Sequence, residues 1–164
     1  MAGADTLPEP DDNAEERKSS SATSAATVEP QPQPTELPTP NRVVLVLEDD
    51  LVQLRLLQQH LESLGLTLLT ARSIAEAQQH LSENRPQLAI FDVNLPDGSG
   101  LELCEQLDSD PRHCTMPIIV LSSMTGNDMI RKTRASGGCY FVGKPYDPNV
   151  LLILIERALG ESLQ

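Results

Sequence analysis

The sequence predicts an α/β fold in which a doubly wound, five-stranded parallel sheet carries helices on both faces. Five short aliphatic runs recur between residues 43 and 142, and they lack the polar alternation of a strand with one face in water. Segments with helical spacing of apolar residues separate the runs. Strands that alternate with helices in this way pair in parallel, because each crossover helix packs back onto the sheet.

The five runs are the expected strands. The first, residues 43–47, reads Val-Val-Leu-Val-Leu, which is typical of a strand buried on both faces. The other expected strands are residues 66–70, 87–91, 117–121 and 139–142.

Start and stop signals place the first two helices. Leucines at 54, 57, 61 and 64 share one helical face after the first strand, and Gly65 is a helix stop. Ser73 is an N-cap for the second helix, which we expect to run to about Glu83. Glu76, three residues after Ser73, completes a capping box.

The remaining helices are predicted from similar signals. A loop with Pro96, Gly98 and Gly100 leads to a third helix whose apolar face is Leu101, Cys104 and Leu107. A polar fourth helix spans about residues 127–136 and ends at Gly137-Gly138. Asp147 caps the last helix, with Pro148 at its first position.

Composition separates the first 41 residues from the rest. Seven of the 13 prolines lie in residues 1–41, with eight acidic and two basic residues. Such a segment buries too little apolar surface to offset the entropy of ordering. We therefore expect a disordered tail over 1–41 and a single domain over 42–164. The tail is a solvated spacer or, alternatively, a docking or modification segment.

Charge and composition exclude several classes of function. The net charge is −12, so we expect no nucleic-acid partner, which would need Lys and Arg to displace phosphate counterions. No apolar run approaches the roughly 20 residues that span a bilayer, and no secretory signal is present, so we expect no membrane partner. Three cysteines favour a reducing, cytoplasmic location, and nothing has zinc-ligand spacing.

Polar side chains follow four of the five expected strands. These are Glu48, Asp49 and Asp50 after the first, Asp92 after the third, Ser122 and Ser123 after the fourth, and Lys144 after the fifth. Each has an ordinary explanation taken singly, as a cap, a turn residue or a salt bridge. Together they converge, because the carboxyl ends of parallel strands lie on one edge of a sheet.

The convergent groups suit phosphoryl chemistry. Clustered carboxylates raise one another's pKa unless a cation lies between them, and hard oxygen ligands favour Mg²⁺. A carboxylate beside Mg²⁺ can attack a phosphoryl group and carry it as an acyl phosphate, while an ammonium neutralises the phosphoryl oxygens.

Residues 42–164 resemble the receiver domain of bacterial two-component response regulators. The motifs that carry the resemblance are VLVLEDD (44–50) followed by Arg55, LAIFDVNLPDGSG (88–100), PIIVLSS (117–123) and GKPY (143–146). The resemblance covers the predicted domain and none of the tail. It implies a flavodoxin-like (βα)5 fold with strand order 2-1-3-4-5.

The resemblance also implies roles for single residues. Asp92 matches the phosphoacceptor, and Lys144 matches the phosphate-binding lysine. Ser122 matches the switch hydroxyl and Phe141 the switch aromatic. The implied Mg²⁺ ligands are Glu48, Asp49, Asp92 and the backbone carbonyl of Asn94.

Departures from the family pattern are small. Glu48 replaces the commoner Asp, Ser122 the commoner Thr, and Leu95 the commoner Met, and none removes a needed group. A phosphorylation-independent pseudo-receiver that acts as a protein-interaction module is the main alternative. A haloacid-dehalogenase-type phosphatase would need an acid where Asn94 stands. A flavodoxin-like cofactor binder would need a phosphate-cradling loop after the first strand, where the sequence is acidic.

The last helix carries more apolar surface than packing requires. Residues 150–155 are all apolar, and Leu151, Ile155, Ala158 and Leu159 already supply one stripe for the sheet. Leu152, Ile153 and Leu154 then form an interaction face, for a homodimer or another partner. The alternative is that neighbouring side chains cover them.

The resemblance implies partners rather than a substrate. The printed chain ends at Gln164, so we expect a stand-alone response regulator without an output domain. A histidine kinase or a histidine phosphotransfer protein would donate the phosphoryl group. A downstream effector protein would read the conformational change. Apart from self-phosphorylation and autodephosphorylation at Asp92, we expect no enzyme activity.

Overall fold

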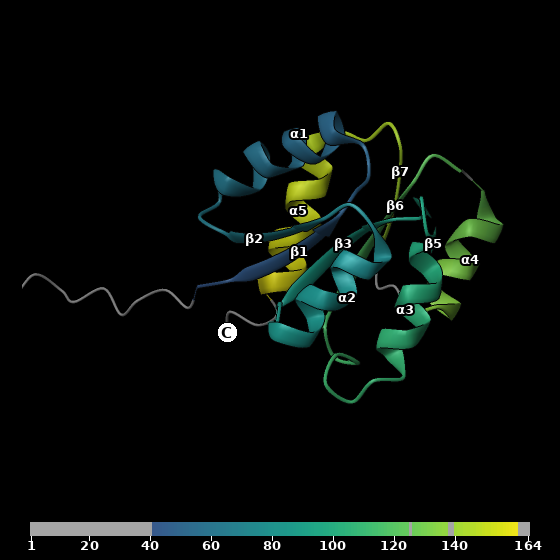
Figure 1. Ribbon diagram of the computed structural model, residues 1–164. Coiled ribbons are helices and arrows are strands. Elements are labelled where there is room, and N and C mark those ends of the chain that lie inside the picture. The colour runs from purple at the N-terminus through teal and green to yellow at the C-terminus, as the bar shows by residue number, and fades with distance from the viewer. Residues whose placement is uncertain (1–40, 125, 138–139, 161–164) are drawn as a thin grey trace, which may run out of the picture. The chain divides into compact units, whose positions relative to one another are not determined.

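Five parallel strands form the central sheet of the computed structural model, which describes residues 41–124, 126–137 and 140–160 (Figure 1). The strands are β1 (Val43–Leu47), β2 (Thr67–Ala71), β3 (Leu88–Asp92), β6 (Ile118–Ser122) and β7 (Tyr140–Gly143). Their order across the sheet is β2-β1-β3-β6-β7, with every pair parallel. This confirms the predicted 2-1-3-4-5 order, because β6 and β7 are the fourth and fifth strands of that sheet. The predicted tail lies outside the described residues apart from Asn41.

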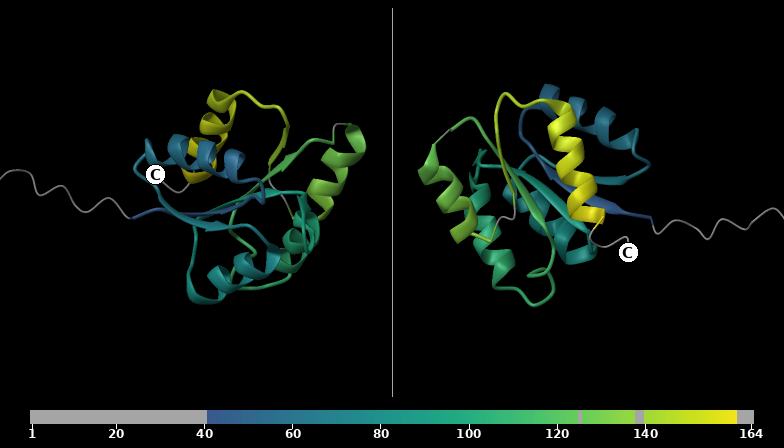
Figure 2. Two further views of the ribbon diagram at one scale, coloured as in Figure 1. Left: turned by 45° about the horizontal axis from the view of Figure 1, so that its top comes forward. Right: turned by 180° about the vertical axis from the view of Figure 1, so that it is seen from behind.

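Helices cover both faces of the sheet, which confirms the doubly wound prediction. They are α1 (Leu51–Glu62), α2 (Ile74–Glu83), α3 (Gly100–Asp108), α4 (Asn127–Ala135) and α5 (Pro148–Gly160). Both views in Figure 2 show α1 and α5 side by side on one face, with α2 and α3 on the other.

The strand residues alternate between two apolar cores, as the period of two requires. On β1, Val44 and Val46 pack with α1 and α5, whereas Leu45 and Leu47 pack with α2 and α3. All four side chains are at most 1% exposed. A strand with helices over both faces therefore needs an unbroken apolar run, which explains the sequence of residues 43–47.

Side-chain caps start the first two helices. Asp50 accepts hydrogen bonds from the N–H groups of Val52 and Gln53 at 2.8 and 3.1 Å. Ser73 accepts from Glu76 N at 3.2 Å, as predicted. The other half of the predicted capping box differs, because the Glu76 carboxylate accepts from Arg72 N at 2.8 Å, one residue before the cap.

A two-stranded antiparallel hairpin was not predicted. It consists of β4 (Asn94–Leu95) and β5 (Gly98–Ser99), and it lies in the expected loop after β3. Two-residue strands are too short to show a periodic pattern. Gly98 has φ +150°, a conformation that favours glycine.

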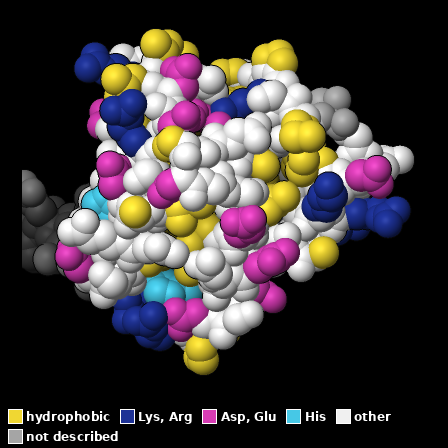
Figure 3. Space-filling model, turned by 45° about the vertical axis from the view of Figure 1, so that its right-hand side comes forward, with side chains coloured by type: hydrophobic (Ala, Val, Ile, Leu, Met, Phe, Trp, Pro, Cys, Tyr) yellow, Lys and Arg dark blue, Asp and Glu magenta, His cyan; other side chains and the backbone are white. Residues whose placement is uncertain are grey.

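The surface carries charges of both signs. Figure 3 shows Asp and Glu side chains interspersed with Lys, Arg and apolar side chains on the face that it presents. Among the described residues, no helix is long and apolar enough to cross a membrane.

Replacing Leu57 by Ala should lower the free energy of unfolding by about 2–5 kcal/mol, because the Leu57 side chain, on the inner face of α1, is 1% exposed and its removal leaves a cavity. Its neighbour Leu56 is 50% exposed, so Leu56→Ala should change that free energy by less than about 0.5 kcal/mol. Urea unfolding of both variants measures the difference. Equal losses would contradict the orientation of α1.

Candidate functional site

The carboxyl ends of β1, β3 and β7 bring two carboxylates and an ammonium together. Lys144 Nζ lies 2.6 Å from Glu48 Oε2 and 3.1 Å from Asp92 Oδ2. Glu48 is 1% exposed and Asp92 is 6% exposed. Lys144 is therefore the bridge between two buried carboxylates from different strands.

Backbone hydrogen bonds fix these residues at the carboxyl ends of their strands: Asp92 is the last residue of β3, and Glu48 and Lys144 directly follow β1 and β7. Glu48 N donates to Ala71 O at 3.0 Å, and Lys144 N donates to Ser122 O at 2.7 Å. Val93 N, after Asp92, donates to Leu121 O at 3.1 Å. The side chains thus extend from a rigid sheet edge rather than from free loops.

Burial and pairing act in opposite directions on the pKa values at this edge. Burial raises the pKa of Glu48, and this outweighs the lowering by the hydrogen bond from Lys144. Burial lowers the pKa of Lys144, but the hydrogen bonds and charges of Glu48 and Asp92 outweigh it and hold that pKa above its ordinary value. Lys144 is therefore a cation at neutral pH.

The residues fit a divalent cation. Glu48, Asp49 and Asp92 each offer a carboxylate oxygen, and these oxygens lie within 4.8 Å of one another. Lys144 pairs with Glu48 and Asp92, which are buried, whereas Asp49 is more exposed. Carboxylate oxygens are the ligands that Mg²⁺ and Ca²⁺ prefer.

Asn94 lies beside this cluster, in the first strand of the hairpin. Its N–H donates to Asp92 Oδ1 at 3.3 Å. The Asp92 carboxylate is thus held through both oxygens, one by Lys144 and one by Asn94.

Ser122 and Phe141 lie on the two strands next to this cluster. Ser122 is fully buried, and its Oγ accepts a hydrogen bond from Met124 N at 3.0 Å. Phe141 is partly buried and packs on the core beneath α2 and α3, whereas Tyr140 packs on the opposite core. The two adjacent rings therefore lie on different faces of the sheet.

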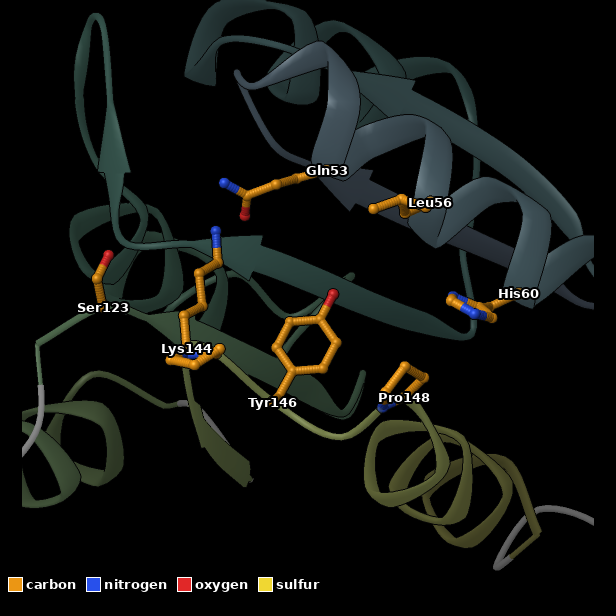
Figure 4. Close-up of a pocket in the computed structure, with 8 residues that line it drawn as sticks. Gln53, Leu56, His60, Ser123, Lys144, Tyr146 and Pro148 are labelled. Atoms are coloured by element: carbon orange, nitrogen blue, oxygen red, sulfur yellow. The ribbon is translucent and has the colours of Figure 1, made fainter.

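A pocket of about 450 Å³ opens beside Lys144, and sequence reasoning missed it. Its lining residues are Gln53, Leu56, His60, Ser123, Lys144, Pro145, Tyr146 and Pro148. Figure 4 shows that Gln53 and Lys144 point toward one another across it and that the Tyr146 hydroxyl points toward α1. Burial raises the pKa of Tyr146. The helical spacing of Gln53, Leu56 and His60 was the available signal.

The predicted interaction face on α5 contains both exposed and partly buried residues. Ile153 is 62% exposed, whereas Leu152 and Leu154 are half-buried and Leu154 packs on the core beneath α1 and α5. The predicted stripe of Leu151, Ile155, Ala158 and Leu159 is buried. Of the three named residues, Ile153 is the most exposed.

A buried cluster of carboxylates with a bridging lysine, at the carboxyl edge of a 2-1-3-4-5 parallel sheet, defines a class of signalling domain. The family model described as the response regulator receiver domain matches residues 44–156. The chain belongs to this family, whose members act in two-component signalling.

Individual relatives agree with the family model. The transcriptional regulatory protein GltR of Pseudomonas aeruginosa is 33% identical over 121 residues, which cover 74% of this chain and 50% of GltR. This chain therefore spans half the length of GltR. The polar-differentiation response regulator DivK of Brucella anthropi is 26% identical over 119 residues, which cover 73% of this chain and 97% of DivK.

A solved structure shows the same fold. The signal receiver domain of a histidine kinase from Syntrophus aciditrophicus superposes with a TM-score of 0.69 at 31% identity. The match covers 73% of this chain and 91% of that domain.

Replacing Lys144 by Met should lower the free energy of unfolding by about 3 kcal/mol at pH 8, because two buried carboxylates lose their cation. The loss should shrink toward pH 5. Lys144 lowers the pKa of Glu48 against the effect of burial, so its removal raises that pKa further. The folded variant therefore takes up a proton at Glu48 at a higher pH than wild type does, and it regains stability relative to wild type as the pH falls.

Urea unfolding at both pH values measures this loss. Lys132→Met on the exposed face of α4 is the matched control, and it should be neutral at both. A loss for Lys144→Met that is as large at pH 5 as at pH 8 would contradict the assigned charges.

Proposed function

We propose that this protein accepts a phosphoryl group on Asp92 and signals through the resulting conformational change. The observation that supports it most is the Asp92 carboxylate itself, held by Lys144 at 3.1 Å within the acidic cluster. Asp92 also stands at the phosphoacceptor position of the receiver motif. A histidine kinase or a histidine phosphotransfer protein is the proposed donor.

The chain's own groups suit this transfer. An Asp92 oxygen attacks the phosphorus of a phosphoimidazole, the P–O bond forms, and the P–N bond breaks with its electron pair left on the imidazole. Lys144 places its ammonium where the phosphoryl oxygens gain negative charge. A Mg²⁺ ion held by Glu48, Asp49, Asp92 and the Asn94 carbonyl would neutralise further charge on those oxygens.

Ser122 and Phe141 are the proposed switch. The Ser122 hydroxyl leaves Met124 N and donates to the phosphoryl group, which opens space for the Phe141 ring to move inward. Phe141 packs on the core that includes Met129 of α4, so the shift would alter α4 and β7. Phosphorylation supplies the local charge that selects between the two states.

We also propose how the conformational change is passed to another protein. A downstream effector protein reads the switched face, and Ile153 of α5 offers exposed apolar surface for it or for a second copy of the chain. Residues 42–164 are the proposed receiver unit, and a stand-alone arrangement is proposed by analogy with DivK, 97% of which the match covers. The odd count of three cysteines is too few for a disulfide scaffold and favours a cytoplasmic location.

Incubation with Mg²⁺ and acetyl phosphate should give a single phosphoryl adduct by intact-mass spectrometry, lost on adding a chelator and absent from Asp92→Asn. Asp49→Asn should lose most of the adduct, because it removes a member of the acidic cluster. The adjacent Asp50→Asn should keep it, because Asp50 caps α1 and is outside that cluster.

An adduct that persists on Asp92→Asn would reject the acceptor assignment. If wild type gives no adduct and binds no beryllofluoride in the presence of Mg²⁺, the phosphorylation-independent interaction module becomes the better account.

Ser122→Ala should form the adduct but lose the movement of Phe141, because the hydroxyl that would meet the phosphoryl group is gone. The matched control is Ser123→Ala, one residue on and exposed. Aromatic NMR signals with and without beryllofluoride report the movement. An unchanged Phe141 response in Ser122→Ala would rule out this switch.

A further inference from the structure

Two loops carry the acidic site, and residues 72–75, which lead from β2 into the first turn of α2, contact both. One loop joins β1 to α1 and carries Asp49. The other is the β4–β5 hairpin, which begins with Asn94, two residues after Asp92. Neither loop is part of the five-stranded sheet, so its position has to be fixed by other contacts.

Asp97, at the tip of the hairpin, holds the first turn of α2. Its Oδ1 accepts a hydrogen bond from Ile74 N at 2.9 Å, and its Oδ2 accepts from Ala75 N at 3.1 Å. The Ser73 cap satisfies Glu76 N, the next N–H along the helix. The two hydrogen bonds lower the pKa of Asp97, so it is a carboxylate at neutral pH.

Two glycines allow the hairpin to pack closely against α2 on one side and against the end of β3 on the other. A Cβ on Gly98 would lie 2.9 Å from the Ile74 side chain, so the hairpin is in close contact with α2. Gly100 leaves no room for a Cβ beside the Asp92 carbonyl oxygen, and its N–H donates to Val93 O at 2.9 Å. The hairpin is therefore held between the end of β3 and the start of α2.

Arg72 makes the corresponding contact with the other loop. Its Nη2 and Nε lie 3.2 and 3.4 Å from the Asp49 carbonyl oxygen. The start of α2 is thus connected to both loops that flank Asp92. The Arg72 side chain donates to the backbone of the Asp49 loop, and the Asp97 side chain of the hairpin accepts from the backbone of α2.

We propose that Asp97 and Arg72 are positioning residues for the cation site, which hold the Asp49 loop and the Asn94 hairpin at a fixed separation through the first turn of α2. This inference rests on the proposed function, since it takes the acidic cluster as the cation site. Neither side chain touches the reacting atoms. Their effect is preorganisation, because ligands that are already in place lose less freedom when the ion binds.

Calorimetric titration of the full chain with Mg²⁺ tests the proposal without any phosphoryl transfer. Asp97→Ala should raise the Mg²⁺ Kd by about tenfold, a typical effect of losing an outer contact of a metal site. Asp97→Asn keeps one acceptor oxygen without the charge and should recover part of the affinity. Glu62→Ala, at the far end of α1, removes the same charge and should leave the Kd unchanged.

Arg72→Met is the second variant, because it leaves the α2 cap intact and should also weaken Mg²⁺ binding. Hydrogen exchange of residues 94–99 should speed up in Asp97→Ala and stay unchanged in Glu62→Ala. Equal Kd values for Asp97→Ala and wild type would overturn the proposal. Equal losses in Asp97→Ala and Asp97→Asn would also overturn it, since charge alone would then explain the effect.

The two hypotheses separate in this experiment. If wild type binds Mg²⁺ but forms no phosphoryl adduct with any phosphodonor, the proposed function is wrong. The Mg²⁺ Kd values of the variants would then still show whether Asp97 and Arg72 position the cation site. A wild type that binds no Mg²⁺ would overturn both.

Discussion

Burial of negative charge at one sheet edge is the constraint on which the site depends. Glu48 and Asp92 are each less than a tenth exposed, and Asp49 lies within ligand distance of both. Taking carboxylates out of water is costly unless they are paired. Lys144 offsets one charge, and the remaining carboxylates could hold a cation, which is the basis of the proposed phosphoryl transfer.

The parallel sheet makes such an arrangement tolerable. Glu48 and Lys144 are 96 positions apart in the chain, yet strand pairing on either side of β3 brings both to the same edge as Asp92. Apolar contacts on both faces of the sheet hold the strands in place. The strand ends that carry Glu48 and Asp92 are therefore rigid enough to resist the repulsion between these two carboxylates. The sheet order changes direction between β1 and β3, which is where open parallel sheets bind ligands.

Local patterns were enough to predict much of this from the sequence. The unbroken apolar runs predicted strands buried on both faces, and the residue after each run predicted what reaches the edge. Asp92 and Lys144 were expected at this edge because a strand end fixes a side chain within one or two residues. The apolar stripe of α5 followed from helical spacing alone.

Features that depend on packing between distant segments could not be predicted in this way. The strands of the β4–β5 hairpin are too short to show an alternation of apolar and polar residues. In the sequence Asp97 is an ordinary turn residue, and its hydrogen bonds to α2 are apparent only from the structure. Glu76 fits a capping box in sequence, but its carboxylate accepts from Arg72 N. The exposure of Ile153 and the partial burial of Leu154 likewise depend on how α1 and α5 meet.

The free energy of unfolding as a function of Mg²⁺ concentration tests the central claim most directly. The comparison is made at constant ionic strength with KCl, so that screening of surface charge stays fixed. If uncompensated carboxylates form a cation site, wild type should gain about 2.7 kcal/mol at a Mg²⁺ concentration one hundred times the Kd, and Asp49→Asn should gain far less. A free energy of unfolding that does not change with Mg²⁺ in wild type would contradict the account.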